Sequence, residues 1–306
     1  MFLVVLPQVA CMLGYMLCGW ALARAGRARA ANTRTLAAFL VYVCTPGMII
    51  NAFQGTAYDA NDFRLICLFF AVTLGAQLLM MLLVRLLTRL WKENARARLL
   101  PLAAVTGNVG FLGLPLVSAL FPASPIVACY SIAYSTGMNL LMFTVGAGLL
   151  TNDRRHISLR GALLNPTTLS VAVALPLYLL RVRLPRAVME PVALLGRMTT
   201  PLCMFVLGLR LAASDLRALL RPPFTWAACG LKLVAFPLLA WGCSRLIPGL
   251  DAAFTGSVLA LSAMPAAALL LSLAELYGCE QEQSAGILLV STLLSVVTIP
   301  LMMLLL

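Results

Sequence analysis

The sequence predicts an all-α integral membrane protein with ten transmembrane helices, arranged as two inverted five-helix repeats whose fourth and ninth helices are broken. Composition is the first observation, because 62% of the 306 residues are hydrophobic and only 10% are charged. Soluble domains carry about a quarter charged residues, so this chain has too little charge to cover a soluble core. The second observation is a series of long apolar runs, and the third is a set of motifs that recur after half the chain.

The apolar runs are long enough to cross a bilayer, which takes about 20 mostly apolar residues per helix. Ten such spans follow one another along the chain. In order they cover Phe2–Leu22, Thr35–Phe53, Leu65–Thr88, Leu99–Leu120, Ile126–Leu150, Ala162–Leu180, Pro191–Leu211, Phe224–Ile247, Thr255–Tyr277 and Ala285–Leu306. The third span continues into a basic segment, and the seventh contains Arg197, which we expect to reach the outer surface.

The basic residues are distributed unevenly over the loops, which predicts the orientation of the spans. Odd-numbered loops hold fifteen Lys and Arg residues, and even-numbered loops hold five. Because cytoplasmic loops are enriched in Lys and Arg, we expect the odd-numbered loops in the cytoplasm and both termini outside it. The ninth loop, with the sequence GCEQEQ, is acidic and departs from this pattern. The expected location is the inner (plasma) membrane, with the lipid bilayer as the surroundings.

Charge and cysteine content exclude several other classes of function. The net charge of +12 is explained by the basic loops, so no nucleic-acid partner is expected. None of the nine Cys residues forms a CxxC pair, which favours inert buried thiols over disulfides or a zinc site. The one histidine, His156, lies beside Arg154 and Arg155, and no catalytic or nucleotide-binding motif accompanies it. We therefore expect no enzyme activity, no metal and no cofactor.

Two similar motifs indicate an internal repeat. VCTPGM begins at Val43 in the second span, and MTTPLC begins 155 residues later, at Met198 in the seventh. This offset is close to half the chain and divides it into repeats at 1–153 and 154–306. Each repeat has five spans, an odd number, so the second must enter the membrane from the opposite face. Inverted repeats with paired broken helices are typical of secondary transporters.

Prolines interrupt the fourth and ninth spans at corresponding positions, Pro115 and Pro265. Proline removes a backbone donor, and hydrocarbon offers no water to replace the lost hydrogen bond. Proline also suits the first position of a helix, and neither Leu114 nor Met264 before it can cap a helix. We therefore expect a second half-helix to begin at each proline. Two such N-termini would bind an anion. The alternative is a plain proline kink with glycines for close packing.

Side chains near the breaks complete the predicted site. Asn108 could bind a ligand or satisfy broken backbone, and Tyr134 and Asn139 lie about one turn apart in the fifth span, where packing is the alternative. Lys232 lies about 12 Å into its span, at 1.5 Å per residue. It could attract substrate or bind carbonyls of a broken helix. The candidate substrate-binding residues are Asn108, Pro115, Pro265, Gly107, Gly110, Gly113, Met264, Lys232, Tyr134 and Asn139.

The chain resembles the auxin efflux carrier family of membrane transporters, in its bacterial form without a long central hydrophilic loop. The motifs that carry the resemblance are GNVGFLGLPL, LNPTTL, TTPLCMFVLGLRL, LKLVAFPLL and SAMPAAALLLSLAELYG, in this order. The resemblance implies ten spans in two inverted repeats, with the broken fourth and ninth helices crossing at Asn108, Pro115 and Pro265. It also implies elevator-type alternating access and small organic anions as substrates, in the superfamily that includes the sodium–bile acid carriers.

The expected function is therefore a secondary active or facilitative carrier of a small organic anion such as a carboxylate. One alternative is a transport-like membrane sensor or channel for a small anion. Another is a sodium-coupled carrier of the bile acid type, which the absence of Asp and Glu deep in the spans disfavours. Substrate identity, direction and coupling ion stay open at this point, as does a homodimeric assembly.

Overall fold

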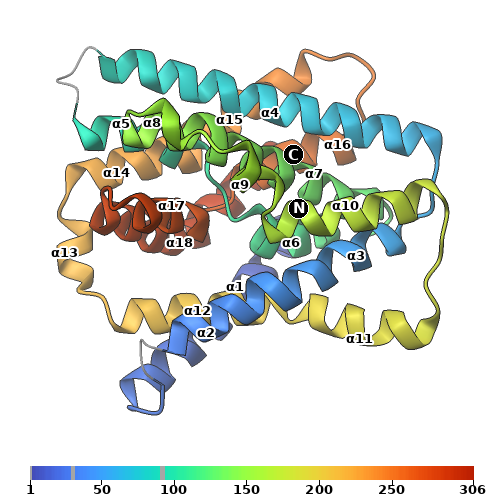
Figure 1. Ribbon diagram of the computed structural model, residues 1–306, viewed down its shortest axis with the longest axis horizontal. Helices are drawn as coiled ribbons and strands as arrows, with labels where there is room; N and C mark the ends of the chain where they lie inside the picture. The colour runs from blue at the N-terminus through green and yellow to red at the C-terminus, as the bar shows by residue number, and fades with distance from the viewer. Residues whose placement is uncertain (1, 29–31, 90–93) are drawn as a thin grey trace.

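The computed structural model describes residues 2–28, 32–89 and 94–306, so the loop residues Arg29 and Lys92 lie outside it. Over the described residues the chain is helical, without strands (Figure 1). The first half contains α1 (Phe2–Arg24), α2 (Asn32–Phe39), η1 (Leu40–Cys44), α3 (Thr45–Gly55), α4 (Ala60–Arg89), α5 (Ala95–Val105), η2 (Val109–Gly113), α6 (Leu114–Leu120), α7 (Ile126–Leu141), η3 (Met142–Gly146), α8 (Ala147–Thr151) and η4 (Arg154–His156).

The second half continues with α9 (Leu159–Leu163), α10 (Pro166–Leu179), α11 (Arg186–Arg197), α12 (Thr199–Ala212), α13 (Leu216–Leu220), α14 (Pro223–Gly230), η5 (Leu231–Ala235), α15 (Phe236–Arg245), α16 (Ala252–Ser262), α17 (Ala268–Tyr277), α18 (Gln281–Met302) and η6 (Met303–Leu305). The segments η1, η2, η3 and η5 are π-helical turns within longer helices, whereas η4 and η6 are 3-10 turns. Three of the four π-helical turns end two residues before a proline: Pro46, Pro115 and Pro237.

Within the described residues, eight helical segments are long and apolar enough to cross a membrane. They are Val4–Arg24, Thr33–Gly55, Ala60–Arg89, Ala95–Leu120, Ile126–Thr151, Arg186–Ala212, Pro223–Arg245 and Gln281–Leu305. These eight match eight of the ten predicted spans. The predicted sixth span is the shorter helix α10, of 14 residues, because Asn165 and Pro166 set a helix start later than expected. The predicted ninth span is divided into α16 and α17.

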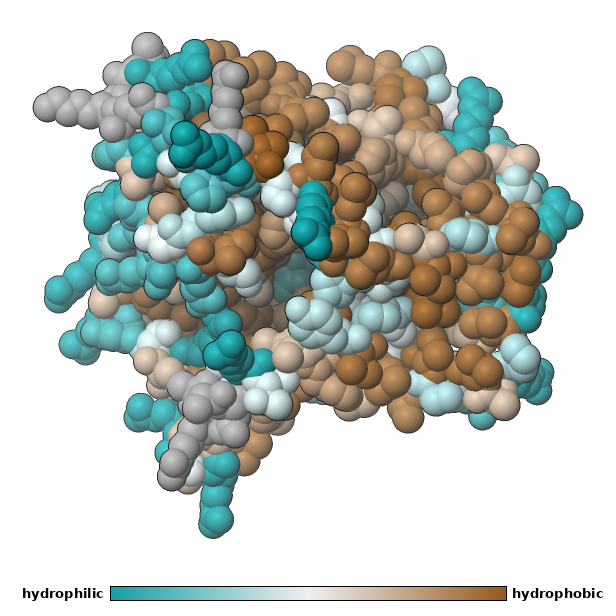
Figure 2. Space-filling model, viewed as in Figure 1, coloured by the Kyte–Doolittle hydropathy of each residue, from teal (hydrophilic) through white to brown (hydrophobic). Residues whose placement is uncertain are grey.

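The surface suits a bilayer. Large hydrophobic side chains are exposed along the outer helices, among them Leu17 of α1, Leu82 and Leu87 of α4, and Val297 of α18. Figure 2 shows hydrophobic residues over the middle of one face and hydrophilic residues gathered towards its left and right edges. The helices, which satisfy their own backbone hydrogen bonds, can therefore meet lipid along their length while the polar ends meet water.

Glycines allow the closest helix contacts. Gly19 of α1 faces the Phe205 carbonyl of α12, and Gly208 of α12 faces the Met16 carbonyl, with no room for a side chain at either glycine. A Cβ on Gly196 at the end of α11 would lie 2.9 Å from the Met48 backbone of α3. Small residues at membrane helix contacts let backbones approach and pack tightly. These contacts join α1, α3, α11 and α12 into one packed group.

The broken helices lie at the centre of the protein. In the segment Ala95–Leu120, 78% of the apolar window is buried, against 28% in Val4–Arg24. The first break covers Thr106–Asn108, between α5 and η2, and the second covers Ala263–Ala267, between α16 and α17. Irregular backbone therefore occurs where protein surrounds it, which is where a membrane tolerates it.

Candidate functional site

The two breaks touch each other directly. The backbone N–H of Asn108 in the first break donates a hydrogen bond to the carbonyl of Pro265 in the second, at 2.7 Å. Segments about 150 residues apart in the sequence therefore meet through their irregular backbone. The hydrogen bond also replaces a helical partner that each break has lost.

The first break is a tight turn centred on Asn108. Its backbone angles, φ −77° and ψ 57°, are those of an inverse γ-turn, and the Val109 N–H donates to the Gly107 carbonyl at 2.8 Å. A Cβ on Gly107 would lie 3.1 Å from Nζ of Lys232 and 3.3 Å from Cγ2 of Val109, closer than side chains normally pack. Glycine therefore fits this position because the turn is packed against the lysine.

The second break is held by its neighbour α18. The Ala266 N–H donates to Oγ of Ser291 at 3.0 Å, and the Ala267 backbone is extended, with ψ 153°. The new helix begins at Ala268, three residues after Pro265. The expectation that the half-helix begins at Pro265 itself is wrong, because the chain needs these extended residues to pass the other break.

The expectation that a half-helix begins at Pro115 is also wrong. The helical segment starts earlier, at Val109, and Pro115 lies in its second turn, at the start of α6. Proline in that place leaves the carbonyl of Phe111 without its usual N–H donor. The hydroxyl of Thr200 in α12 donates to this carbonyl at 2.5 Å, so the helix continues through the proline.

A cavity of about 250 Å³ lies beside the crossing breaks. Three helix N-termini line it: η2 at Gly110 and Phe111, α17 at Ala268 and Leu269, and α10 at Pro166 and Thr167. Its polar side chains are Thr45, Asn108, Ser135, Asn139, Asn165, Thr167 and Ser272. None of the described lining residues is charged.

Two of these N-termini have no side-chain cap. Neither Asn108 before η2 nor Ala267 before α17 makes a capping hydrogen bond with its side chain. The Asn108 amide instead lies 3.7 Å from Sγ of Cys203. The first N–H groups of a helix have no partner within the helix. With their partial positive charge, they favour a negative group in the cavity.

The predicted site residues divide into two sets. Asn108, Gly107, Gly110 and Asn139 line the cavity. The other six are not among its described lining residues: Pro115, Pro265, Gly113, Met264, Lys232 and Tyr134. Pro265 contributes instead through its carbonyl, which fixes Asn108, and Tyr134 is fully buried in the packed interior.

Lys232 is buried against the end of a broken helix. Its side chain is fully buried, its Nζ donates to the carbonyl of Ser262 at 2.9 Å, and it lies 4.8 Å from the ring centre of Phe236. Ser262 is the last residue of α16, where helix carbonyls lack partners and carry partial negative charge. The ammonium therefore sits at the negative end of α16, just behind Gly107 and outside the cavity.

Sequence reasoning missed several polar residues of the cavity. Thr45, Ser135 and Ser272 carry no distinctive signal, since a lone hydroxyl in a span is common. Asn165 did carry one: an Asn directly before Pro and Thr is typical of a helix start. In the structure its side chain accepts from the Thr168 N–H at 2.9 Å and caps α10.

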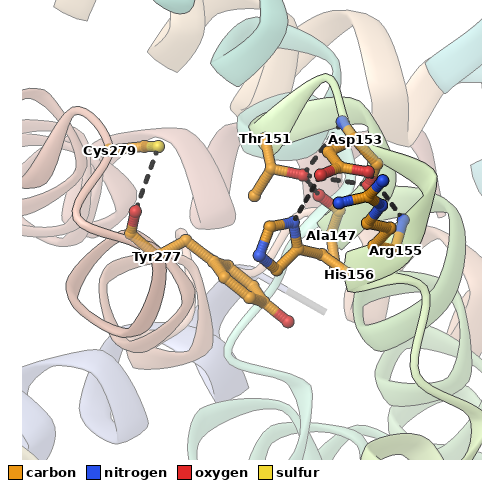
Figure 3. Close-up of polar contacts among 7 residues, drawn as sticks. All are labelled: Ala147, Thr151, Asp153, Arg155, His156, Tyr277 and Cys279. Atoms are coloured by element: carbon orange, nitrogen blue, oxygen red, sulfur yellow. Dashed lines mark hydrogen bonds and ion pairs between the residues drawn. The ribbon is translucent and has the colours of Figure 1, made fainter.

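The one histidine lies apart from the cavity, at the ends of α8 and α17 (Figure 3). The His156 ring meets the Tyr277 ring nearly edge-on, with centres 5.1 Å apart, and its Nδ1 lies 3.9 Å from Oδ2 of Asp153. The nearby Cys279 thiol donates to the Tyr277 carbonyl at 3.3 Å. The group therefore joins the loop after α8 to the end of α17. Among the described residues, no group of three or more His, Cys, Asp or Glu could hold a metal.

Comparison with known proteins agrees with this architecture. A family model described as "Membrane transport protein" matches residues 4–303. The chain is also 22% identical over 273 residues to a protein of Rhizobium meliloti (strain 1021) named "Putative malonate transporter". That alignment covers 85% of this chain and 83% of the relative.

Proposed function

Since the chain belongs to the membrane transport protein family, of the auxin efflux carrier type, we propose that it is a secondary carrier of small organic anions, with carboxylates as substrates. It is a multi-pass membrane transporter, because the family is one of membrane transport proteins and eight described helices are long and apolar enough to cross a membrane. The cavity at the crossing breaks is the proposed binding site. The proposed location is the inner membrane, with both termini outside the cytoplasm.

One observation carries the proposal: three helix N-termini converge on a single uncharged cavity. Two of them lack side-chain caps, and although the Val109 and Leu270 N–H groups bond to nearby carbonyls, the N–H groups of Gly110 and Phe111 in η2 and of Ala268 and Leu269 in α17 would bind oxygen atoms of a ligand. A carboxylate accepts such hydrogen bonds and interacts favourably with the positive helix ends. An ammonium or a metal cation would meet the same groups unfavourably.

The size of the cavity favours a small substrate. Its 250 Å³ lies just below the range of about 300–1,000 Å³ typical of small-molecule pockets. A short mono- or dicarboxylate would fit, and the relative's name makes malonate the first compound to test. Asn108 and Asn139 would add side-chain donors beside the backbone.

Helix packing supports the proposed inverted repeats, at residues 1–153 and 154–306. The first span, α1, packs on α12 of the seventh span, and the sixth span, α10, packs on α3 of the second. In both pairs the first span of one repeat contacts the second span of the other. The third and fourth spans, α4 and α5, pair as α15 and α16 do in the second repeat.

The same packing supports elevator-type alternating access. One group comprises α1, α3, α10, α11 and α12, and the other comprises α4 to α7 and α14 to α18. The proposed site lies between them, with Thr45 and Met48 on the first group and the two breaks on the second. Sliding of the second group along the first would carry a bound anion across the membrane.

The proposal is tested with purified protein and liposomes. We expect a thermal-shift screen of mono- and dicarboxylates to find a stabilising ligand, and that ligand to show saturable counterflow in liposomes without a sodium gradient. No shift with any carboxylate, and no uptake, would refute an anion carrier. Binding without counterflow would indicate a sensor or channel. Uptake only with sodium would indicate a carrier of the bile acid type.

A further inference from the structure

A second cavity lies farther along α3, towards its C-terminal end, and shares Met48 with the cavity at the crossing breaks. It measures about 600 Å³ and is lined by residues of α1, α3, α6, α11 and α12. Its polar side chains include Gln8, Asn51, Ser118, Thr199 and Thr200, and Arg197 is the one charged residue among the described lining residues. A mainly apolar cavity with a few hydroxyl and amide groups and one cation is a chemical setting for an anion.

Arg197 lies within a candidate membrane span, where a charged side chain is costly. It is the last residue of α11 and lies near the middle of the candidate span Arg186–Ala212, eleven residues after Arg186 and about 16 Å from that end at 1.5 Å per residue. Arginines that extend to the interface lie near helix ends, and those within a span face a wet cavity or a partner. The side chain is exposed, and no acidic partner is found for it among the described residues.

The position of Arg197 is fixed by its neighbours. The backbone of Gly196 packs on Met48 of α3 without room for a side chain, so the backbone of the next residue, Arg197, is held close to α3. The Thr199 hydroxyl donates to the Gly196 carbonyl at 2.6 Å and lies 3.5 Å from Sδ of Met48. Met48 lines both cavities and stands between them.

We propose that Arg197 forms a second anion site, separated by Met48 from the site at the crossing breaks, and that it binds a small carboxylate. A guanidinium presents a planar fork of donors that matches a carboxylate with two parallel hydrogen bonds. The cavity opens on the side where α3 ends and α7 begins, as its lining residues Gly55, Thr56 and Pro125 indicate. It would receive anions on that side before they reach the crossing site. The proposal rests on the proposed function for its choice of substrate class.

Arginine labelling tests the site directly. Purified protein is treated with phenylglyoxal, and the adducts at Arg197 and Arg186 are quantified by mass spectrometry with and without malonate. Arg186 is the matched control, because it is exposed on the same helix and is not among the described residues that line the cavity. We expect malonate to slow labelling of Arg197 at least threefold and to leave Arg186 unchanged, whereas the neutral malonamide protects neither. Equal labelling with and without malonate would overturn the site, as would equal protection by phosphatidylglycerol alone.

Transport kinetics of Arg197 variants provide a second test of the proposed site. We expect Arg197→Gln to raise the KM for anions entering from the Arg197 side about tenfold, with Arg197→Lys in between and Arg186→Gln unchanged. The KM from the opposite side should not change, which a general folding defect would not produce. An unchanged KM from both sides would overturn the capture role. If wild-type protein carries no anion, the proposed function fails, while the labelling arm still decides whether Arg197 binds a carboxylate.

Discussion

Asn108 is the side chain whose role follows most directly from its surroundings. Its backbone N–H holds the second break, and its side chain lines the cavity without capping η2. We expect Asn108→Ala to lower the affinity for malonate about ten- to a hundredfold, because a hydrogen bond to a charged group contributes about 1.5–3 kcal/mol. Calorimetric titration of the purified variant measures this, with the exposed Asn61→Ala as the matched control. Wild-type affinity in Asn108→Ala would remove the side chain from the site.

Lys232 illustrates the opposite outcome, a charged residue whose geometry favours a structural role. Its ammonium binds the last carbonyl of α16 and is not among the described residues that line the cavity. We expect Lys232→Met to lower the free energy of unfolding by about 1–3 kcal/mol, because the buried Ser262 carbonyl loses its donor. Malonate affinity of the remaining folded protein should stay within twofold. Thermal melting and titration of the same preparation measure both quantities. Reduced affinity with unchanged melting would show that Lys232 acts on the substrate.

At the scale of single residues, the sequence predicts the segments that form the cavity better than it predicts the individual side chains that line it. Asn108 and the glycines around it were found because polar and small residues are conspicuous inside an apolar span. Asn165 and Ser272 were missed because they are far apart in the sequence and line one cavity only in the folded protein. No local pattern reports such a meeting.

At the scale of helices, the sequence predicts both breaks, but the first lies at Thr106–Asn108, before Pro115, whereas the second contains Pro265 and only its half-helix starts later than expected. The sequence predicts that each second half-helix starts at its proline, yet the helix continues through Pro115 because Thr200 satisfies the Phe111 carbonyl. The π-helical turn before Pro115 is part of the same solution, as are those before Pro46 and Pro237. A donor supplied by a distant helix is invisible in the sequence, so the position of the break could not be predicted.

The pairing of Pro115 with Thr200 predicts a rescue. We expect Thr200→Val to destabilise the protein by about 1–3 kcal/mol, because the Phe111 carbonyl loses its donor in a partly buried place. Pro115→Ala restores an N–H four residues after Phe111, so the double variant should regain most of that stability. Melting of the wild type, both single variants and the double variant gives the coupling energy.

The neighbouring Thr199→Val is the control for this cycle. Its hydroxyl donates to the Gly196 carbonyl, so Pro115→Ala should not rescue it. Additive effects of Thr200→Val and Pro115→Ala would show that the hydroxyl does not replace the missing helical donor.

At the scale of the whole molecule, hydropathy predicted eight full-length spans and their order. The other two spans were longer in the prediction than in the structure, because apolar residues also fill the turns around α10 and between α16 and α17. The inverted repeat, which two motif pairs suggest, stays a prediction that the packing of α1 on α12 and of α10 on α3 supports. The orientation in the membrane stays a prediction, since it depends on loop charges alone.

Cys279 provides the test of that orientation. It follows α17, in the acidic ninth loop that departs from the charge pattern, and we expect it in the cytoplasm. A variant that keeps only Cys279 should react with a membrane-impermeant maleimide in inside-out vesicles and not in intact cells. The matched control carries Ala123→Cys as its one cysteine, in the exposed connection between α6 and α7, and should react in intact cells.

Because five spans separate corresponding loops of the two repeats, labelling of both cysteines from the same side would contradict the inverted repeat. Labelling of each from the side opposite to the expected one would keep the repeat and reverse the whole protein in the membrane, moving the Arg197 cavity to the cytoplasmic face.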